Sequence, residues 1–183
     1  MRRVLSVGLG VLFLAAVAIA QTTPPARPAA RPAASGRPAG TLAQVMRGIL
    51  FPSSNILFDA QSNDPGAPPK AAPTSGGATA QYANVYGGWQ AVENAAIALD
   101  ESVDLILKPR LCQNGKPAPV AQANYKMWAQ NLRDVALKAL TAAKAKDQDK
   151  VIEVDGDLTD ACANCHTKYR DVGDADSPKR CTP

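Results

Sequence analysis

The sequence of 183 residues has little of the apolar–polar alternation that marks β-strands, and it contains only one histidine, His166. The weak alternation argues against a β-sheet and favours helices. The single histidine excludes any metal centre that needs two imidazole ligands from one chain. Together these two features indicate a helical protein in which any metal site uses at most one imidazole from this chain.

The expected folded part also lacks an excess of positive charge. The whole chain has 20 Lys and Arg against 16 Asp and Glu, a net charge of +4. Removing five arginines that lie before residue 38 leaves 15 basic residues against 16 acidic ones; they are Arg2, Arg3, Arg27, Arg31 and Arg37. The remainder is nearly neutral, so we expect no binding to nucleic acid.

The N-terminus has the three parts of a secretory signal peptide. Met1-Arg2-Arg3 supplies the positive start, an apolar run extends from Val4 to Ala20, and Ala18-Ile19-Ala20 supplies the small residues of a cleavage site. We therefore expect residues 1–20 to be removed on export. No cysteine follows the run, so a lipid anchor is not expected. The alternative is an uncleaved membrane anchor, because the run is nearly long enough to span a bilayer.

Three stretches have the composition of connections. Residues 21–40 are mainly proline, alanine and arginine and should form a disordered linker. Residues 61–80 are rich in proline, glycine and alanine and are long for a connection between helices, so we expect them to be flexible. Residues 173–183 form a C-terminal tail. What remains, residues 41–172, has the size of one domain.

The first helical segment should begin at Thr41 and end near Ala60. Thr41 and Gln44 have the spacing of a capping box, in which each side chain accepts from a backbone N–H of the other residue. Pro52 predicts a kink, eased by Gly48 at the carbonyl that the proline ring would strike. The apolar residues expected on one face are Leu42, Met46, Ile49 and Ile56.

Three further segments place apolar residues at alternating steps of three and four, the pattern of a helix in a left-handed bundle. The second follows Gly88 and should end at Lys108, because Pro109 disfavours helix in the residue before it. The third should begin near Pro119, and the fourth spans about 148–172. The expected inward residues are Trp89, Val92, Ala96, Leu99, Val103 and Ile106 in the second, Tyr125, Trp128, Leu132, Val135, Ala139 and Ala142 in the third, and Val151, Val154, Leu158, Ala161 and Cys165 in the fourth.

Three acidic residues lie close together in the fourth segment, Asp155, Asp157 and Asp160. Their spacing is not that of an EF-hand calcium loop. We therefore expect a solvated acidic face there and no calcium site.

The strongest motif is Cys162-Ala163-Asn164-Cys165-His166, in which two cysteines separated by two residues are followed at once by histidine. This is the attachment signature of a c-type haem. Each thiol adds to one vinyl group of the haem, and two intervening residues let one helical turn span the porphyrin edge. The imidazole of His166 then supplies the proximal ligand to the iron. We predict one covalently bound haem c.

Two other uses of Cys162 and Cys165 remain open. A redox dithiol or disulfide of the thioredoxin type would begin a helix beside a β-strand, and nothing strand-like surrounds the motif. A structural zinc needs four ligands, so Cys112 or Cys181 would have to complete the set without a second paired motif. Both fit the sequence less well than haem.

Four antiparallel helices with a haem on the last one make an all-α fold, an up-down-up-down four-helix bundle with the haem at one end. In that order the start of the first helix, the end of the second, the start of the third and the end of the fourth share one end of the bundle. His166 and Met46 both belong to this end. The residues expected on the wall of the haem pocket are Leu42, Ile49, Leu105, Ile106, Tyr125 and Trp128.

The run from Cys162 to Arg170, CANCHTKYR, resembles the C-terminal motif of class II c-type cytochromes, the cytochrome c prime family. In that family the haem site lies on the last helix and is followed by an aromatic–arginine pair. The resemblance covers residues 41–172 in the number and order of helices, but only the haem motif is specific. The proline in the first helix, the long first connection, Cys112 and Cys181 depart from the family pattern. By analogy, the resemblance implies a homodimer.

Further site predictions concern two side chains and the spare cysteines. Met46 is expected as the sixth iron ligand, because it lies on an inward face at the haem end whereas Met127 does not. Low-spin members of the class II family carry a methionine ligand in a comparable place. Arg170 lies one helical turn beyond the proximal histidine, so we expect it at the haem edge. Cys112 and Cys181 should form a disulfide, because both lie at the haem end and export exposes them to oxidising conditions.

These features predict a one-electron carrier, and not an enzyme, located in the periplasm. Covalent haem is attached outside the bacterial cytoplasm in the families that carry it, which agrees with the export signal. The alternative is a five-coordinate haem protein that binds or senses nitric oxide or carbon monoxide, as many class II relatives do. A small peroxidase has little support, because no second histidine is present to act beside the iron.

The identity of the redox partner does not follow from the sequence. Six basic residues at the haem end could steer an acidic partner, although a mixed solvated surface is the commoner explanation; they are Lys108, Arg110, Lys116, Lys126, Lys168 and Arg170. We expect membrane association only if residues 1–20 stay on the chain.

Overall fold

The computed structural model describes residues 38–68, 75, 77, 87–173 and 180–181. All of them belong to one compact unit, Gly36–Pro183. The predicted signal peptide and most of the predicted linker, of the first connection and of the C-terminal tail lie outside the described residues.

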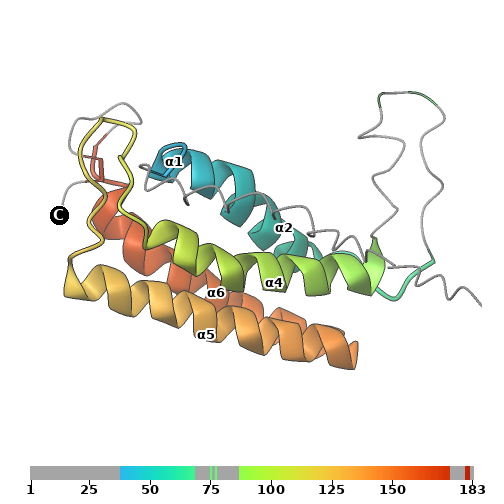
Figure 1. Ribbon diagram of the computed structural model, residues 1–183. Helices are drawn as coiled ribbons and strands as arrows, with labels where there is room; N and C mark the ends of the chain where they lie inside the picture. The colour runs from blue at the N-terminus through green and yellow to red at the C-terminus, as the bar shows by residue number, and fades with distance from the viewer. Residues whose placement is uncertain (1–37, 69–74, 76, 78–86, 174–179, 182–183) are drawn as a thin grey trace, which may run out of the picture. The chain divides into compact units, whose positions relative to one another are not determined.

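The described part is helical and contains no strand, only an isolated bridge between Leu111 and Pro117. The all-α class predicted from the sequence is therefore confirmed for these residues. None of their helices is long and apolar enough to cross a membrane. The elements are α1 (Leu42–Val45), the π-helical turn η1 (Met46–Leu50), α2 (Phe51–Asp59), α4 (Gly88–Ile106), α5 (Ala123–Ala145) and α6 (Gln148–Tyr169) (Figure 1).

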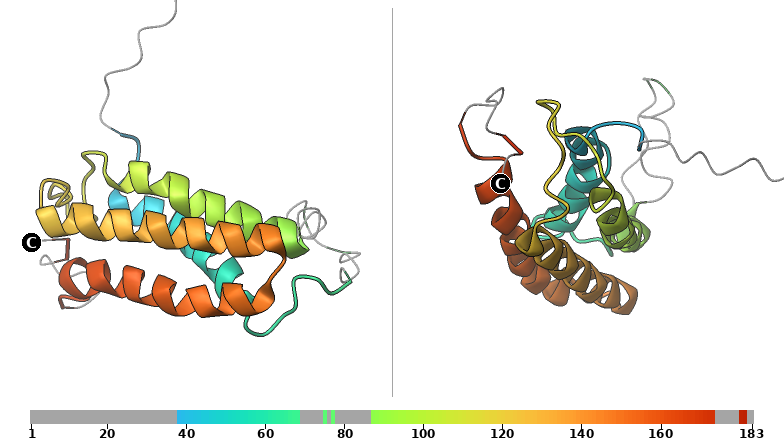
Figure 2. Two further views of the ribbon diagram at one scale, coloured as in Figure 1. Left: turned by 90° about the horizontal axis from the view of Figure 1, so that it is seen from below. Right: turned by 60° about the vertical axis from the view of Figure 1, so that its left-hand side comes forward.

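The three long helices pack in chain order, α4 against α5 and α5 against α6 (Figures 1 and 2). The stretch from α1 to α2 lies mainly on α4, and α2 also contacts α6. The predicted inward faces of the long helices are confirmed, since every residue named for them is buried except four. The four half-buried residues are Trp89, Trp128, Val154 and Cys165.

The start of the first helix is as predicted. The backbone N–H of Gln44 donates to Oγ1 of Thr41 at 3.2 Å, and the backbone N–H of Thr41 donates to Oε1 of Gln44 at 2.7 Å, which completes the capping box. These bonds satisfy N–H groups that a helix start otherwise leaves without partners. The helical stretch ends at Asp59, close to the predicted Ala60.

The predicted kink at Pro52 takes the form of a π turn just before it. The backbone N–H of Phe51 donates to the carbonyl of Met46, five residues back instead of four. Pro52 has no N–H, and its ring would strike the carbonyl of Gly48 in a regular helix. A wider turn of this kind relieves such strain within an otherwise continuous helix.

The π turn also shifts the buried face of the first stretch. The sequence pattern predicted Ile49 and Ile56 on the inner face, but Ile56 is 40% exposed and Ile49 is only half-buried. The prediction for these two residues is wrong because the π turn contains one residue more than a regular helical turn. The extra residue changes which side chains of the first stretch face the core. The buried residues are instead Leu42, Val45, Leu50, Ser53, Leu57 and Ala60.

Three helix boundaries differ from the prediction. α4 ends at Ile106 and not at Lys108. α5 begins at Ala123 and not near Pro119, because the carbonyl of Pro119 accepts from the backbone N–H of Gln122 in a separate turn. α6 ends at Tyr169 and not at Val172. The backbone N–H groups of the next two residues both donate to the carbonyl of His166 at 2.8 Å, which closes the helix early.

Asp155 does not belong to a solvated acidic face, in contrast to the prediction. Its side chain is 3% exposed, and Oδ2 accepts from Nε2 of Gln61 at 3.1 Å. Burial raises the pKa of Asp155 above its ordinary value, and the hydrogen bond from Gln61 opposes this rise. Asp157 and Asp160 are exposed, as expected.

The raised pKa makes stability depend on pH at Asp155. A folded-state pKa above the unfolded one adds stability below the unfolded value, about 3.9, and this stability is lost as pH rises through the folded pKa. Asp155→Asn keeps an oxygen that accepts from Gln61 and cannot ionise. We therefore expect the free energy of unfolding at pH 7 to be higher for the variant than for the wild type. At pH 3.5 the difference between the two should be smaller.

Denaturant unfolding at both values of pH measures this difference. Asp160→Asn, an exposed change on the same helix, is the control and should behave alike at both. An Asp155→Asn variant that is less stable than the wild type at pH 7 would contradict the interpretation.

Candidate functional site

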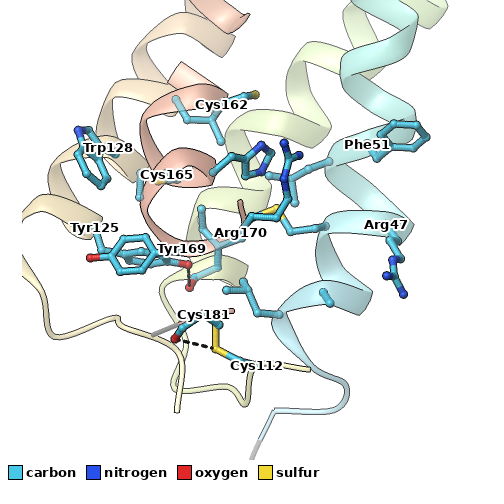
Figure 3. A pocket seen from close by; sticks show the side chains of 18 of the residues that line it. Arg47, Phe51, Cys112, Tyr125, Trp128, Cys162, Cys165, Tyr169, Arg170 and Cys181 are labelled. Carbon is cyan, nitrogen blue, oxygen red and sulfur yellow. Dashed lines mark hydrogen bonds between the residues drawn. A yellow bond between two sulfur atoms is a disulfide. The ribbon is translucent and has the colours of Figure 1, made fainter. Parts of the chain in front are cut away.

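A cavity of about 510 Å³ lies among the helices, lined mostly by apolar side chains. The first stretch contributes residues from Leu42 to Ser54, α4 contributes Leu99 and Ile106, and α5 contributes residues from Tyr125 to Leu132. α6 contributes its last third, from Ala161 onward. The cavity thus gathers residues from all parts of the described fold (Figure 3).

The three residues of the haem motif all line this cavity. Cys162, Cys165 and His166 occupy positions i, i+3 and i+4 of α6, so they share one face of the helix. The two cysteines form no disulfide, and all three side chains are half-buried. Both thiols are therefore available for chemistry, on the same wall as the only imidazole of the chain.

Burial keeps these groups neutral. It raises the pKa of Cys165 to about 11, helped by the neighbouring Cys162. Burial also raises the pKa of Cys162, although the Arg170 guanidinium opposes the rise. The pKa of His166 is lowered, first by burial and then by Arg170. At neutral pH the site presents two thiols and a neutral imidazole, the form of histidine that binds metals.

Four of the six residues predicted for the wall of a haem pocket line this cavity. Leu42, Ile106, Tyr125 and Trp128 line the cavity as expected. Ile49 and Leu105 do not line it, although both pack against the core. In the first stretch the π turn brings Leu50 to the wall in place of Ile49.

Met46 and Arg170 both line the cavity, from different helices. Met46 begins the π turn and is half-buried. Arg170 caps the end of α6, where its Nε lies 2.6 Å from Oδ1 of Asp171 and its Nη2 donates to Oδ2 at 3.1 Å. This guanidinium lowers the pKa of the Asp171 carboxyl. Arg170 therefore borders the cavity, while its guanidinium pairs with Asp171, which does not line the cavity.

Cys112 and Cys181 are joined by a disulfide, with their Cα atoms 5.7 Å apart. Both residues also line the cavity (Figure 3). The backbone N–H of Cys181 donates to the carbonyl of Tyr169 at 2.5 Å, so the tail is tied to the end of α6 as well. Since these are the only other cysteines, no free thiol remains to complete a four-ligand zinc site with Cys162 and Cys165.

No family model, no curated protein and no solved structure matches this chain. The resemblance to class II c-type cytochromes therefore rests on the haem motif and on the order of helices. What it implies for function remains a proposal.

Several cavity residues were missed by sequence reasoning. Tyr169 is buried, and its ring lies edge-on to Tyr125 at 5.7 Å and to Trp128 at 6.2 Å. Its hydroxyl donates to Oδ1 of Asn124 at 3.1 Å. The aromatic position in the motif was the only sequence signal for this role.

Arg47 and Phe51 also line the cavity, on the opposite side from Cys162 and Arg170 (Figure 3). Phe51 is nonetheless 65% exposed, so it stands at the opening. Their placement follows from the π turn, which no pattern in the sequence revealed.

The disulfide should contribute to stability. It closes a loop between residues 69 positions apart, and such a bridge typically adds about 2–4 kcal/mol by restricting the unfolded chain. We expect Cys112→Ala plus Cys181→Ala to lower the free energy of unfolding by about this amount. Denaturant unfolding measures the change, and the reduced wild type is the matched comparison. Non-reducing peptide mapping that finds both residues as free thiols would show that the bridge does not form.

Proposed function

We propose that this chain is an exported monohaem c-type cytochrome that carries single electrons in the periplasm. The observation that carries the proposal is the presence of two unpaired thiols and the only imidazole on one wall of an apolar cavity. No other arrangement of cysteine and histidine among the described residues offers a comparable site.

The chain fits a covalently attached haem c in chemistry and in size. Cys162 and Cys165 have the sequence spacing of the c-type attachment motif, and His166 offers a neutral imidazole beside them. A volume of about 510 Å³ falls within the range of cofactor sites, roughly 300–1,000 Å³. A bound haem would supply an iron that accepts and releases one electron.

An antiparallel up-down-up-down four-helix bundle is the proposed architecture. In its support, the cavity is lined by the beginning of the first stretch, the end of α4, the first turns of α5 and the end of α6. Helices that alternate in direction bring these four ends together. The same order is implied by the resemblance to the cytochrome c prime family, in which a homodimer is a common state.

The residues around the cavity suit an electron carrier better than an enzyme. Among the described residues that line it, none is a carboxylate and none is a second histidine. The described lining therefore offers neither a carboxylate nor a second imidazole for proton transfer to a ligand of a bound haem. The mostly apolar lining would limit the access of water, which would raise the influence of the iron ligands on the reduction potential. The proposed partner is a redox protein and not a nucleic acid.

The second candidate function is binding or sensing of nitric oxide or carbon monoxide. The observation in its favour is the apolar wall beside Met46, formed by Leu50 and Phe51. If the sulfur of Met46 does not bind iron, this wall would border an open coordination position. The position of Met46 relative to the iron therefore decides between the two functions.

Covalent attachment is the first test. After extraction with acidified acetone, the colour should remain on the wild-type polypeptide, because two thioether bonds hold the haem. Cys162→Ala plus Cys165→Ala should release it. The control is Cys112→Ala plus Cys181→Ala, which removes the same number of sulfurs and should retain the colour. Free extraction of the haem from the wild type would exclude c-type attachment.

Ligation by Met46 is the second test. We expect the ferric wild type to be low-spin and to show the weak sulfur-to-iron band in the near infrared that marks histidine–methionine ligation. Met46→Ala should abolish the band and convert the iron to high spin. Met127→Ala is the matched control, since Met127 is 60% exposed and does not line the cavity. A wild type that is already high-spin and binds carbon monoxide readily would put gas binding first.

A further inference from the structure

Outside its N-terminal segment the chain is nearly neutral. Its acidic residues are nevertheless unevenly distributed along the described part. No Asp or Glu occurs in residues 38–58 or in residues 105–133. These two stretches contain the start of the first helix, the end of α4, the connection to α5 and the first turns of α5. They supply the part of the cavity wall that faces α6.

Four exposed lysines lie in the second of these stretches and at the end of α6. Lys108, Lys116, Lys126 and Lys168 are exposed and form no ion pair with the described residues. Lys168 lies over the ring of Tyr169 at 5.8 Å, next to the cavity. None of the described carboxylates therefore neutralises their positive charges.

Three cations farther along α5 and at the start of α6 pair with carboxylates, whereas Lys144 and Lys146 near the end of α5 are exposed and form no ion pair with the described residues. Arg133 contacts Asp100 at 3.2 Å and Asp104 at 2.8 Å. Lys138 lies 2.9 Å from Asp157. Lys150 pairs with a glutamate one helical turn on, at 2.5 Å. The cavity end is therefore set apart by its lack of Asp and Glu in residues 38–58 and 105–133, and not by unpaired cations alone.

The opening of the cavity adds an apolar element to this surface. Phe51 is largely exposed on the side opposite Cys162, with Arg47 one turn before it on the same stretch (Figure 3). An exposed aromatic side chain together with exposed cations at the same end of the fold has the composition of a contact surface, which combines apolar and charged residues. The surface consists of Phe51, Arg47, Lys108, Lys116, Lys126 and Lys168.

We propose that this surface docks an acidic redox protein and that electrons pass at the cavity opening, an inference that rests on the proposed function. Charge complementarity selects the partner: a cluster of carboxylates would be attracted over a distance by the unpaired cations. The apolar centre would then bring the partner close to the site. An anionic membrane surface is the rival occupant, and the experiment separates the two.

The experiment measures the charge at the site of electron exit. Reduced wild-type protein is oxidised with anionic ferricyanide and, separately, with the cationic tris(phenanthroline)cobalt(III) complex, at increasing ionic strength. Steering by positive charge makes the ferricyanide rate fall with salt and the cobalt rate rise. Lys116→Gln plus Lys126→Gln should lower the ferricyanide rate at low salt by about threefold or more.

The control is Lys138→Gln plus Lys144→Gln, which removes the same charge from α5 away from the cavity. It should change the ferricyanide rate by less than about 1.5-fold, because screening limits distant charges. Equal effects of the two double variants would overturn the docking surface while leaving the cytochrome proposal intact. A wild type without covalent haem would overturn both. Binding to phosphatidylglycerol vesicles that Lys116→Gln plus Lys126→Gln abolishes, with unchanged ferricyanide rates, would assign the surface to a membrane and overturn the protein partner.

Discussion

The site depends on the periodicity of one helix. The inner stripe of α6 begins with Val151, Leu158 and Ala161, which are buried against the other helices. At 3.6 residues per turn the same stripe continues through Cys165 and ends at the buried Tyr169. One face of α6 therefore packs against the other helices in its first part and lines the cavity in its last part. The thiols and the imidazole lie on the cavity wall because the stripe that holds α6 in the core extends past the region of close packing.

The cavity arises from a change of side-chain size along α5. In its second half the buried residues include Ala136, Ala139, Ala142 and Ala143, which let neighbouring helices approach closely. In its first half Tyr125 and Leu132 are buried and Trp128 is half-buried, so larger side chains hold the helices apart. The same helix thus builds a tightly packed half and a half with room for a ligand.

The sequence predicts the long helices well because their apolar steps of three and four repeat over several turns. The sequence pattern fails at the π turn. One hydrogen bond there spans five residues instead of four, and the order of apolar residues does not show that the buried face shifts at this point. Ile49 and Ile56 were assigned to the wrong side for this reason, and Phe51 and Arg47 were missed at the cavity. The motif residues are different, because Cys162, Cys165 and His166 need only local helical geometry. Burial of Asp155 could not be predicted, because it depends on Gln61 in a distant part of the chain.

Bonds at the cavity end fix the positions that the helices alone would leave loose. The hydroxyl of Tyr125 donates to the carbonyl of Ile106 at 3.1 Å, which ties α5 to α4. The buried Arg110 donates to the carbonyl of Leu105 at 2.8 Å and to that of Ala39 at 2.7 Å, which ties the end of α4 to the residues before α1. The Cys112–Cys181 disulfide ties the same connection to the tail after α6. Side chains held by such supporting bonds keep their geometry through a reaction. Walls fixed in this way would move little on electron transfer, which would support the proposed electron carrier, because a gas-binding protein has to admit a ligand between its walls.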